Sequence, residues 1–247
     1  MVTGSSRGIG QAIVLAFARE GADVIVNYIG NDTGARETCA QVEKLGRRAV
    51  PIQADVSVPA ETQKLVEGSI AALGSLDILV NNAGIEKRAP FLEITEKDYR
   101  AVIDVDLTGP LFLSQAFVRH LRQANRPGKI INISSVHEEL PFPHFTPYCM
   151  AKGGLKMMMR NLAIELGDCG ITVNNIAPGA IETPINRKLL NDPKELAALK
   201  NNIPMRRLGR TSDVSGAAVF LASADADYVT GATLVVDGGL LWNYSEQ

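Results

Sequence analysis

The sequence has little of what marks several classes of protein. It holds three cysteines and three histidines in 247 residues, and Cys39, Cys149 and Cys169 are far apart. An odd, dispersed set of cysteines argues against a disulfide framework and a zinc site, and it fits a reducing compartment. The histidines have no metal-ligand spacing either. We therefore expect no metal site and a cytoplasmic location.

Strong charge and long apolar runs are also missing. A formal net charge of -2 offers no electrostatic footprint for nucleic acid or anionic lipid. No stretch approaches the ~18 apolar residues of a membrane span, and the N-terminus does not read as a secretory signal. A chain that is 46% hydrophobic and 21% charged suits a sizeable core. The expected partner is a small-molecule substrate, with neither nucleic acid nor membrane.

Strand-like and helix-like segments alternate along the whole chain. Unbroken apolar runs separated by segments of helical length and period indicate a parallel sheet covered by helices on both faces. No Pro/Gly/Ser linker or internal repeat divides the chain. The sequence predicts one doubly wound, Rossmann-type α/β domain over residues 1–247. The expected strands are 23–28, 49–54, 76–81, 129–134, 171–176 and 233–236.

The first strand of such a domain is short here. Only Met1 and Val2 precede Thr3, whereas the fold wants a full central strand before its first turn. We expect either a stub or a start that lies upstream, so the first strand is apparently truncated.

Residues 129–152 hold the candidate chemistry. Ser135 ends an apolar strand, and Tyr148 and Lys152 are four residues apart at the start of a helical pattern, which places them on one face. A phenol titrates too high to act as a base at neutral pH unless a nearby cation favours the phenolate. A serine hydroxyl beside it can hydrogen-bond the reacting oxygen. Alone, a Tyr-x-x-x-Lys pair is more often a solvated surface pair.

Two further motifs accompany that pair. One is the glycine-rich stretch 3–10, and the other is Asn81-Asn82-Ala83-Gly84. Glycines let a backbone approach a diphosphate closely, and the following helix N-terminus favours its charge. Together with Ser135, Tyr148 and Lys152, these motifs resemble the short-chain dehydrogenase/reductase family over the whole chain.

The resemblance implies a nicotinamide dinucleotide and a set of residues that hold it. Asp55-Val56 would contact the adenine, although a helix N-cap region reads equally well there. The segment 178–184 would meet the nicotinamide amide. The expected cofactor residues are Gly4, Ser6, Arg7, Gly8, Ile9, Gly10, Asp55, Val56, Asn82, Ala83, Gly84, Tyr148, Lys152, Pro178, Gly179, Ile181 and Thr183.

The choice between NADP and NAD depends on the second strand. An NAD site usually carries an acidic residue at the end of that strand, but here the strand ends Val26-Asn27-Tyr28-Ile29. Arg7 matches a family position that meets a 2′-phosphate. We expect NADP, with use of NAD as the alternative.

One position departs from the family. Relatives usually have an asparagine where this chain has Asp106, and that asparagine helps to hold a water in a proton relay. An ionised Asp106 near Lys152 would offset the cation that favours the Tyr148 phenolate. We count Asp106 with the catalytic residues Ser135, Tyr148 and Lys152, and we expect a pH–rate profile shifted to the alkaline side.

Local strings resemble the branch of bacterial glucose 1-dehydrogenases, among them Ser134–Glu138 and Gly84-Ile85-Glu86. The implied reaction is hydride transfer between a secondary alcohol or sugar hemiacetal and nicotinamide. Candidate substrate residues are Ser135, Glu86, His137 and Asn186, each also readable as an ordinary loop residue. The alternatives are a 3-oxoacyl-thioester (acyl-carrier-protein) reductase and a non-catalytic NADP-binding sensor. By resemblance, the protein is a homotetramer.

Overall fold

The computed structural model describes residues 1–184 and 192–243. Each of the six predicted apolar runs forms a strand, and every paired strand is parallel to its neighbour. The strands are β1 Val24–Tyr28, β2 Ala49–Gln53, β3 Ile78–Asn81, β4 Gly128–Ile133, β5 Ile171–Pro178 and β6 Thr233–Val236. β5 continues two residues beyond its predicted end, which brings Pro178 into the sheet.

Val2 joins the two parts of the sheet. β1 pairs with β2, and β3, β4, β5 and β6 pair in that order. Val2 forms a parallel bridge to Val26 of β1 and another to Val80 of β3. Val2 therefore takes the place of the first strand, and it lies where the strand order reverses. In open α/β sheets, ligands bind at the carboxyl ends of the strands at this point.

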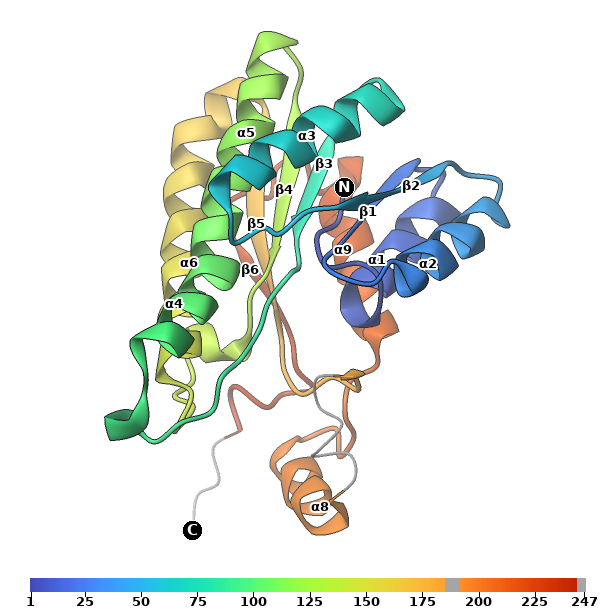
Figure 1. Cartoon of the computed structure of the whole chain (residues 1–247). Coiled ribbons are helices and arrows are strands. Elements are labelled where there is room, and N and C mark those ends of the chain that lie inside the picture. The colour runs from blue at the N-terminus through green and yellow to red at the C-terminus, as the bar shows by residue number, and fades with distance from the viewer. Residues whose placement is uncertain (185–191, 244–247) are drawn as a thin grey trace.

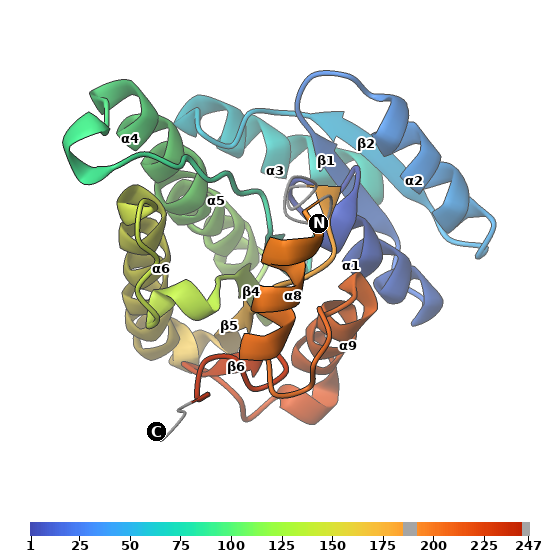
Figure 2. The same ribbon diagram turned by 90° about the horizontal axis from the view of Figure 1, so that it is seen from below.

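Helices cover both faces of the sheet (Figure 1). Helices α3, α5 and α6 lie on one face with α4 beside α6, and α1, α2 and α9 lie on the other; the view from below separates the two layers (Figure 2). The predicted doubly wound architecture is confirmed. The helices are α1 Gly8–Arg19, α2 Thr33–Glu43, α3 Pro59–Leu73, α4 Glu96–Ile103, α5 Gly109–Gln123, α6 Thr146–Leu166, α8 Pro193–Asn202 and α9 Thr211–Ala222.

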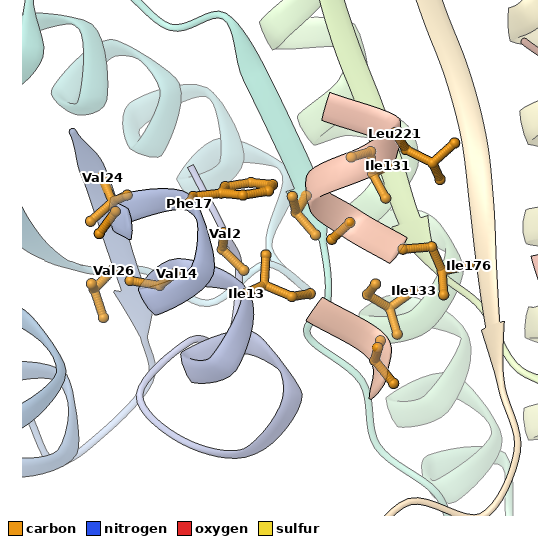
Figure 3. Packing of buried hydrophobic residues seen from close by; sticks show 14 of the residues in the cluster. Val2, Ile13, Val14, Phe17, Val24, Val26, Ile131, Ile133, Ile176 and Leu221 are labelled. Carbon is orange, nitrogen blue, oxygen red and sulfur yellow. The ribbon is translucent and has the colours of Figure 1, made fainter. Parts of the chain in front are cut away.

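Each face of the sheet has its own apolar core. On the α1/α9 face, Ile13 and Phe17 of α1 pack with Val2, Ile131 and Leu221 (Figure 3). On the opposite face, the core residues include Leu79, Phe117, Ile130 and Met159, all with less than 2% of their surface exposed. Burial of this much apolar surface is the main favourable term in folding. It fixes the strands whose carboxyl ends carry the polar residues described below.

The helical stretch Glu96–Gln123 has the length and composition of a membrane span. It is the core helix of this sandwich, because Leu113, Phe117 and Leu121 are fully buried in the cluster that lies against β3 and β4. A π-helical turn, Asp104–Thr108, separates α4 from α5 within it.

Candidate active site

The glycine-rich turn is tied to the end of β3. The Thr3 hydroxyl accepts the backbone N–H groups of Asn82 and Ala83, both at 2.9 Å. The Asn82 amide in turn donates to the Thr3 carbonyl at 2.8 Å. The structure therefore places the two predicted cofactor motifs, 3–10 and 82–84, side by side. Thr3 was missed as a site residue, although its position just before the glycine turn was a usable signal.

Two glycines in this turn have specific reasons to be glycine. Gly8 has a φ of 63°, a conformation that other residues rarely adopt. At Gly10, an added Cβ would lie 2.5 Å from the Asn82 side-chain nitrogen and 2.8 Å from the Gly4 carbonyl oxygen. The turn is thus packed as closely as a backbone allows, and it leaves its outer side open to a ligand.

The start of α1 is suited to an anion. The helix begins at Gly8, its first turn carries no acidic residue, and within the described chain no side chain caps it by a hydrogen bond. Free backbone N–H groups at a helix start attract phosphate oxygens. Arg7, which precedes the helix, is exposed. The arrangement fits the diphosphate of a dinucleotide.

Asp55 is used by the turn that leads into α3. Its carboxylate accepts the Ser57 N–H at 2.9 Å and the Ser57 hydroxyl at 2.7 Å, and its own N–H donates to Glu61 at 2.6 Å. Val56 belongs to a hydrophobic core. These contacts favour the helix-entry reading of the pair, and a contact to adenine stays a prediction.

The segment 178–184 lies at the carboxyl edge of the sheet, as expected. Gly179 donates to the Val236 carbonyl at 3.0 Å, and Glu182 donates to that of Gly209 at 2.8 Å. Ile181 is buried. A Cβ built on Gly8 would lie 3.9 Å from Pro184, so this segment reaches the glycine turn. That both segments border the dinucleotide stays a prediction.

Ser135, Tyr148 and Lys152 come together at the same edge. β4 leads directly to Ser135, and α6 begins two residues before Tyr148. The Lys152 ammonium lies 5.3 Å from the centre of the Tyr148 ring and donates to the Ile133 carbonyl at 3.2 Å. The Ser135 side chain is close enough to the Tyr148 phenol to act on it, and this contact lowers the pKa of Tyr148. The predicted trio is therefore within mutual reach.

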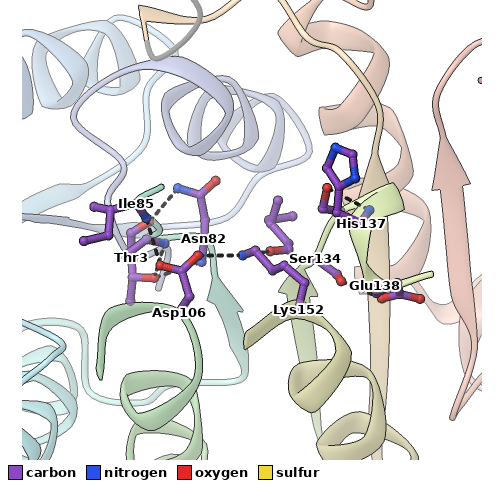
Figure 4. A network of polar contacts seen from close by, with 11 residues as sticks. Thr3, Asn82, Ile85, Asp106, Ser134, His137, Glu138 and Lys152 are labelled. Carbon is purple, nitrogen blue, oxygen red and sulfur yellow. Dashed lines mark hydrogen bonds and ion pairs between the residues drawn. The ribbon is translucent and has the colours of Figure 1, made fainter. Parts of the chain in front are cut away.

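Asp106 forms a buried ion pair with Lys152 (Figure 4). The two charged groups are 3.1 Å apart, and the Asp106 side chain has no exposed surface. Its second oxygen accepts the Ile85 N–H at 2.8 Å. Asp106 sits in the π-helical turn between α4 and α5, a distortion often found at functional sites. Gly84 leaves it room, since a Cβ there would lie 3.0 Å from the carboxylate.

The ion pair changes how the catalytic groups titrate. Burial lowers the pKa of Lys152, but the Asp106 carboxylate and Tyr148 outweigh burial and hold that pKa above its ordinary value. Burial raises the pKa of Asp106, while Lys152 and the Ile85 amide act against burial. The raised pKa of Lys152 favours its charged form, whereas the raised pKa of Asp106 favours its neutral form. Because the contact is close and Asp106 has an amide donor, we treat the pair as ionised near neutral pH.

The net effect on Tyr148 differs from that of the cation alone. Burial raises the pKa of Tyr148 above its ordinary value, and the charges of Asp106 and Glu86 raise it further. Lys152 and the hydrogen bond from Ser135 act in the opposite direction but do not prevail. Lys152 thus lowers the Tyr148 pKa as expected, and Asp106 offsets part of that effect.

His137 lies beside the catalytic tyrosine. Its ring stacks on Phe142 at 4.1 Å between centroids and meets Tyr148 edge-on at 6.3 Å. Its Nδ1 is 3.0 Å from the Leu140 carbonyl, so Nδ1 carries the proton and Nε2 is left as an acceptor. Burial lowers the pKa of His137, which keeps the ring neutral at pH 7.

The other two predicted substrate residues differ in what the structure says of them. Glu86 is an exposed residue on the loop after β3. Partial burial of its carboxyl raises the Glu86 pKa, and the charge of Asp106 raises it further, so Glu86 faces the same site. Asn186 lies outside the described residues.

Comparison with known proteins agrees with this geometry. Residues 4–241 match a family model described as enoyl-(acyl carrier protein) reductase. The chain is 45% identical over 240 residues to 3beta-hydroxysteroid dehydrogenase 1 of Eggerthella lenta, covering 97% of this chain and 92% of that one. It is 42% identical over 241 residues to glucose 1-dehydrogenase 2 of Bacillus subtilis, covering 97% and 93%.

A solved structure is similar over nearly the same length. The crystal structure of a gluconate 5-dehydrogenase from Burkholderia cenocepacia, in complex with NADP and tartrate, has a TM-score of 0.93 and 37% sequence identity, covering 98% of this chain and 94% of that one. The chain belongs to the short-chain dehydrogenase/reductase family. It is an NAD(P)-dependent oxidoreductase that acts on CH–OH groups.

Proposed function

We propose that this protein oxidises a sugar hemiacetal or a similar secondary alcohol with NADP, in the reversible manner of glucose 1-dehydrogenase. The observation that carries the proposal is the convergence of the Tyr148 phenol, the Lys152 ammonium and the Ser135 hydroxyl at the carboxyl edge of the sheet. This edge also holds the glycine turn and the open start of α1.

Each of the three residues has one task. Tyr148 takes the proton of the substrate hydroxyl as general base. Ser135 hydrogen-bonds the same oxygen and fixes its position while its charge changes. Lys152 stabilises the phenolate by its charge and is placed to hold the ribose. When bound, the nicotinamide supplies the hydride chemistry, while the chain supplies position and field.

Asp106 is the fourth member and acts through Lys152. Its carboxylate neutralises part of the charge that would otherwise favour the phenolate. Together with the Ile133 carbonyl, this carboxylate also holds the Lys152 ammonium in a fixed position. We infer that Asp106 makes Tyr148 a weaker base at neutral pH and, in return, keeps the Lys152 ammonium in a fixed position.

A sugar substrate is supported by the polar groups at the site. Nε2 of His137 can accept a hydrogen bond from a sugar hydroxyl, and the Glu86 carboxylate can do the same. The stacked rings of His137, Phe142 and Phe145 give the apolar face of a sugar ring a surface to pack on. One relative named above acts on a steroid by its name, which makes a hydroxysteroid the second substrate class to test.

NADP is proposed because of two exposed residues near the glycine turn. Arg7 is exposed, and among the described residues it forms no salt bridge with an acidic side chain. Ile29, which follows β1, has 67% of its surface exposed where an NAD site would carry a carboxylate. A 2′-phosphate would meet a cation and no repulsion.

We propose a cytoplasmic location from the dispersed cysteines and a homotetramer from the outer faces of two helices. α5 and α6 expose large apolar side chains on their outer faces, among them Leu111, Met157 and Ile164, the last with 84% of its surface exposed. Such faces are commonly covered by another subunit. Light scattering tests this: a mass of about four 26.5 kDa chains supports it, and a monomer contradicts it.

The substrate proposal is tested by a panel of alcohols with both cofactors. D-glucose, other aldoses, polyols and a 3β-hydroxysteroid are each supplied with NADP and with NAD, and cofactor reduction is followed by absorbance. We expect the highest kcat/KM with an aldose and NADP. Highest turnover of the steroid, or of a 3-oxoacyl thioester in the reverse direction, contradicts the sugar assignment. Cofactor binding without turnover of any substrate would show a sensor.

A further inference from the structure

Glu138 is a buried carboxylate that has no task in the scheme above. Its side chain has 2% of its surface exposed. It accepts hydrogen bonds from Ser134 at 2.5 Å, Asn175 at 3.1 Å and Thr233 at 2.8 Å, and it lies 3.6 Å from the Lys156 ammonium. A buried anion is costly unless it is fully paired. This one is paired from four separate segments: the end of β4, β5, β6 and α6.

The carboxylate also ends a row of buried amides that crosses the sheet. Asn81, Asn132 and Asn175 are register partners on β3, β4 and β5. The Asn81 amide donates to Asn132 at 2.8 Å, the Asn132 amide donates to Asn175 at 2.9 Å, and Asn175 donates to Glu138. In these three bonds the donated N–H group points toward Glu138, and the Asn81 amide also donates to the Ser114 hydroxyl at 3.2 Å. An anion at the end stabilises this one orientation, because the reversed row would place a carbonyl oxygen against the carboxylate.

Glu138 is joined to the catalytic serine by a single short turn, the 3-10 helix Val136–Glu138. The Ser135 hydroxyl oxygen accepts the His137 N–H at 3.2 Å, and the Ser135 carbonyl accepts the Glu138 N–H at 2.9 Å. These two bonds fix Ser135 relative to the turn. The Glu138 side chain, on the same turn, fixes the turn relative to β5, β6 and α6 through Asn175, Thr233 and Lys156.

We propose that Glu138 is a positioning residue that holds the Ser135 hydroxyl at the reacting oxygen by anchoring the Val136–Glu138 turn to the sheet. The inference rests on the proposed function, in which Ser135 acts on that oxygen. It assigns to Glu138 no contact with substrate or cofactor. Its effect therefore passes through Ser135 and falls on the chemical step.

The test is a double-mutant cycle between Glu138→Gln and Ser135→Ala. Glutamine keeps the size of the side chain but removes the charge that all four donors point at. A misplaced catalytic group costs up to about 100-fold, so we expect Glu138→Gln to lower kcat about 10- to 100-fold with little change in KM or in the Kd for NADP. In the Ser135→Ala background, the same substitution should change kcat less than about twofold, because coupled residues are not additive.

The neighbouring Glu139→Gln is the matched control. Glu139 directly follows the Val136–Glu138 turn. It also pairs with Lys156, but its side chain is 43% exposed. Because exposed ion pairs contribute little, this control should leave kcat within about twofold of the original. Thermal melting of each variant shows whether it is folded. If Glu138→Gln does not fold, Thr233→Val removes one of the four donors instead and should lower kcat several-fold, again only when Ser135 is present.

Two results would overturn the proposal. One is an equal loss of kcat with and without Ser135, which would make Glu138 a general structural residue. The other is an unchanged kcat in Glu138→Gln. Failure of the proposed function looks different: Ser135→Ala alone would then keep full activity.

Discussion

The Lys152 ammonium lies 3.1 Å from the Asp106 carboxylate, and both side chains are almost completely removed from solvent. Lys152 is thus shared between an anion on one side and the Tyr148 ring, 5.3 Å away, on the other. The pair comes from two helical segments that the fold brings together. Its consequence is that the strength of the base depends on a carboxylate that need not touch the substrate.

Replacing Asp106 by asparagine should shift the pH dependence of oxidation to lower pH. The charge of Asp106 is one cause of the raised pKa of Tyr148, so removing this charge lowers that pKa. Since oxidation needs the phenolate, the rising limb of kcat/KM should appear at a lower pH, and the rate of oxidation near pH 7 should increase. The measurement is kcat/KM against pH for the original protein and for Asp106→Asn.

Asp104→Asn is the control for this experiment. Asp104 lies in the same π-helical turn, and its carboxylate accepts the Thr108 hydroxyl at 3.4 Å. The control should leave the profile in place. A profile that stays unchanged in Asp106→Asn, or moves equally in both variants, would contradict the electrostatic argument.

The glycine turn predicts a sharp contrast between two Gly→Ala substitutions. At Gly10 the new methyl group would overlap Asn82 and the Gly4 carbonyl, so Gly10→Ala should destabilise the fold by about 1–3 kcal/mol and weaken NADP binding. At Gly216, exposed in α9, nothing lies within 4 Å of the built Cβ, and alanine should stabilise by up to about 1 kcal/mol. Denaturant unfolding and NADP titration check both. Equal effects at the two positions would refute the close-packed turn.

Cofactor preference should move with Arg7 and Ile29. Arg7→Ala removes the cation that meets a 2′-phosphate and should raise KM for NADP while KM for NAD changes little. Ile29→Asp should do the reverse, favouring NAD through its ribose hydroxyls and repelling the phosphate of NADP. Ratios of kcat/KM for the two cofactors provide the measurement. If Arg7→Ala affects both cofactors equally, Arg7 binds the diphosphate instead.

The sheet could be predicted because each strand has a recognisable local sequence pattern. Runs such as 129–134 and 171–176 are rich in isoleucine and valine, as expected of a strand buried on both faces. The shortness of the segment before Thr3 is likewise visible in the sequence. The ends were less certain: β5 gains Pro178 because its pairing with Val236 continues past the apolar run.

The candidate site was predictable where spacing along one element decides it. The proximity of Tyr148 and Lys152 follows from their spacing of four residues on one helix. The ion pair with Asp106 could only be anticipated from a resemblance, because it depends on a π-helical turn that no residue pattern marks. Glu138 was missed altogether. Its partners come from β5, β6 and α6, which are far away in the sequence. Before those elements are placed around it, a glutamate three residues after Ser135 looks like any loop residue.

The most direct test of the central claim is the turnover of Tyr148→Phe with the best substrate of the panel. Phenylalanine keeps the ring beside His137 and removes only the phenol oxygen. A general base contributes about 10²- to 10⁴-fold, so kcat should fall by at least about 100-fold while the Kd for NADP stays within a few-fold of the original. A variant that binds NADP and still turns over at the original rate would show that the proton leaves by another group, and the account of this site would be wrong.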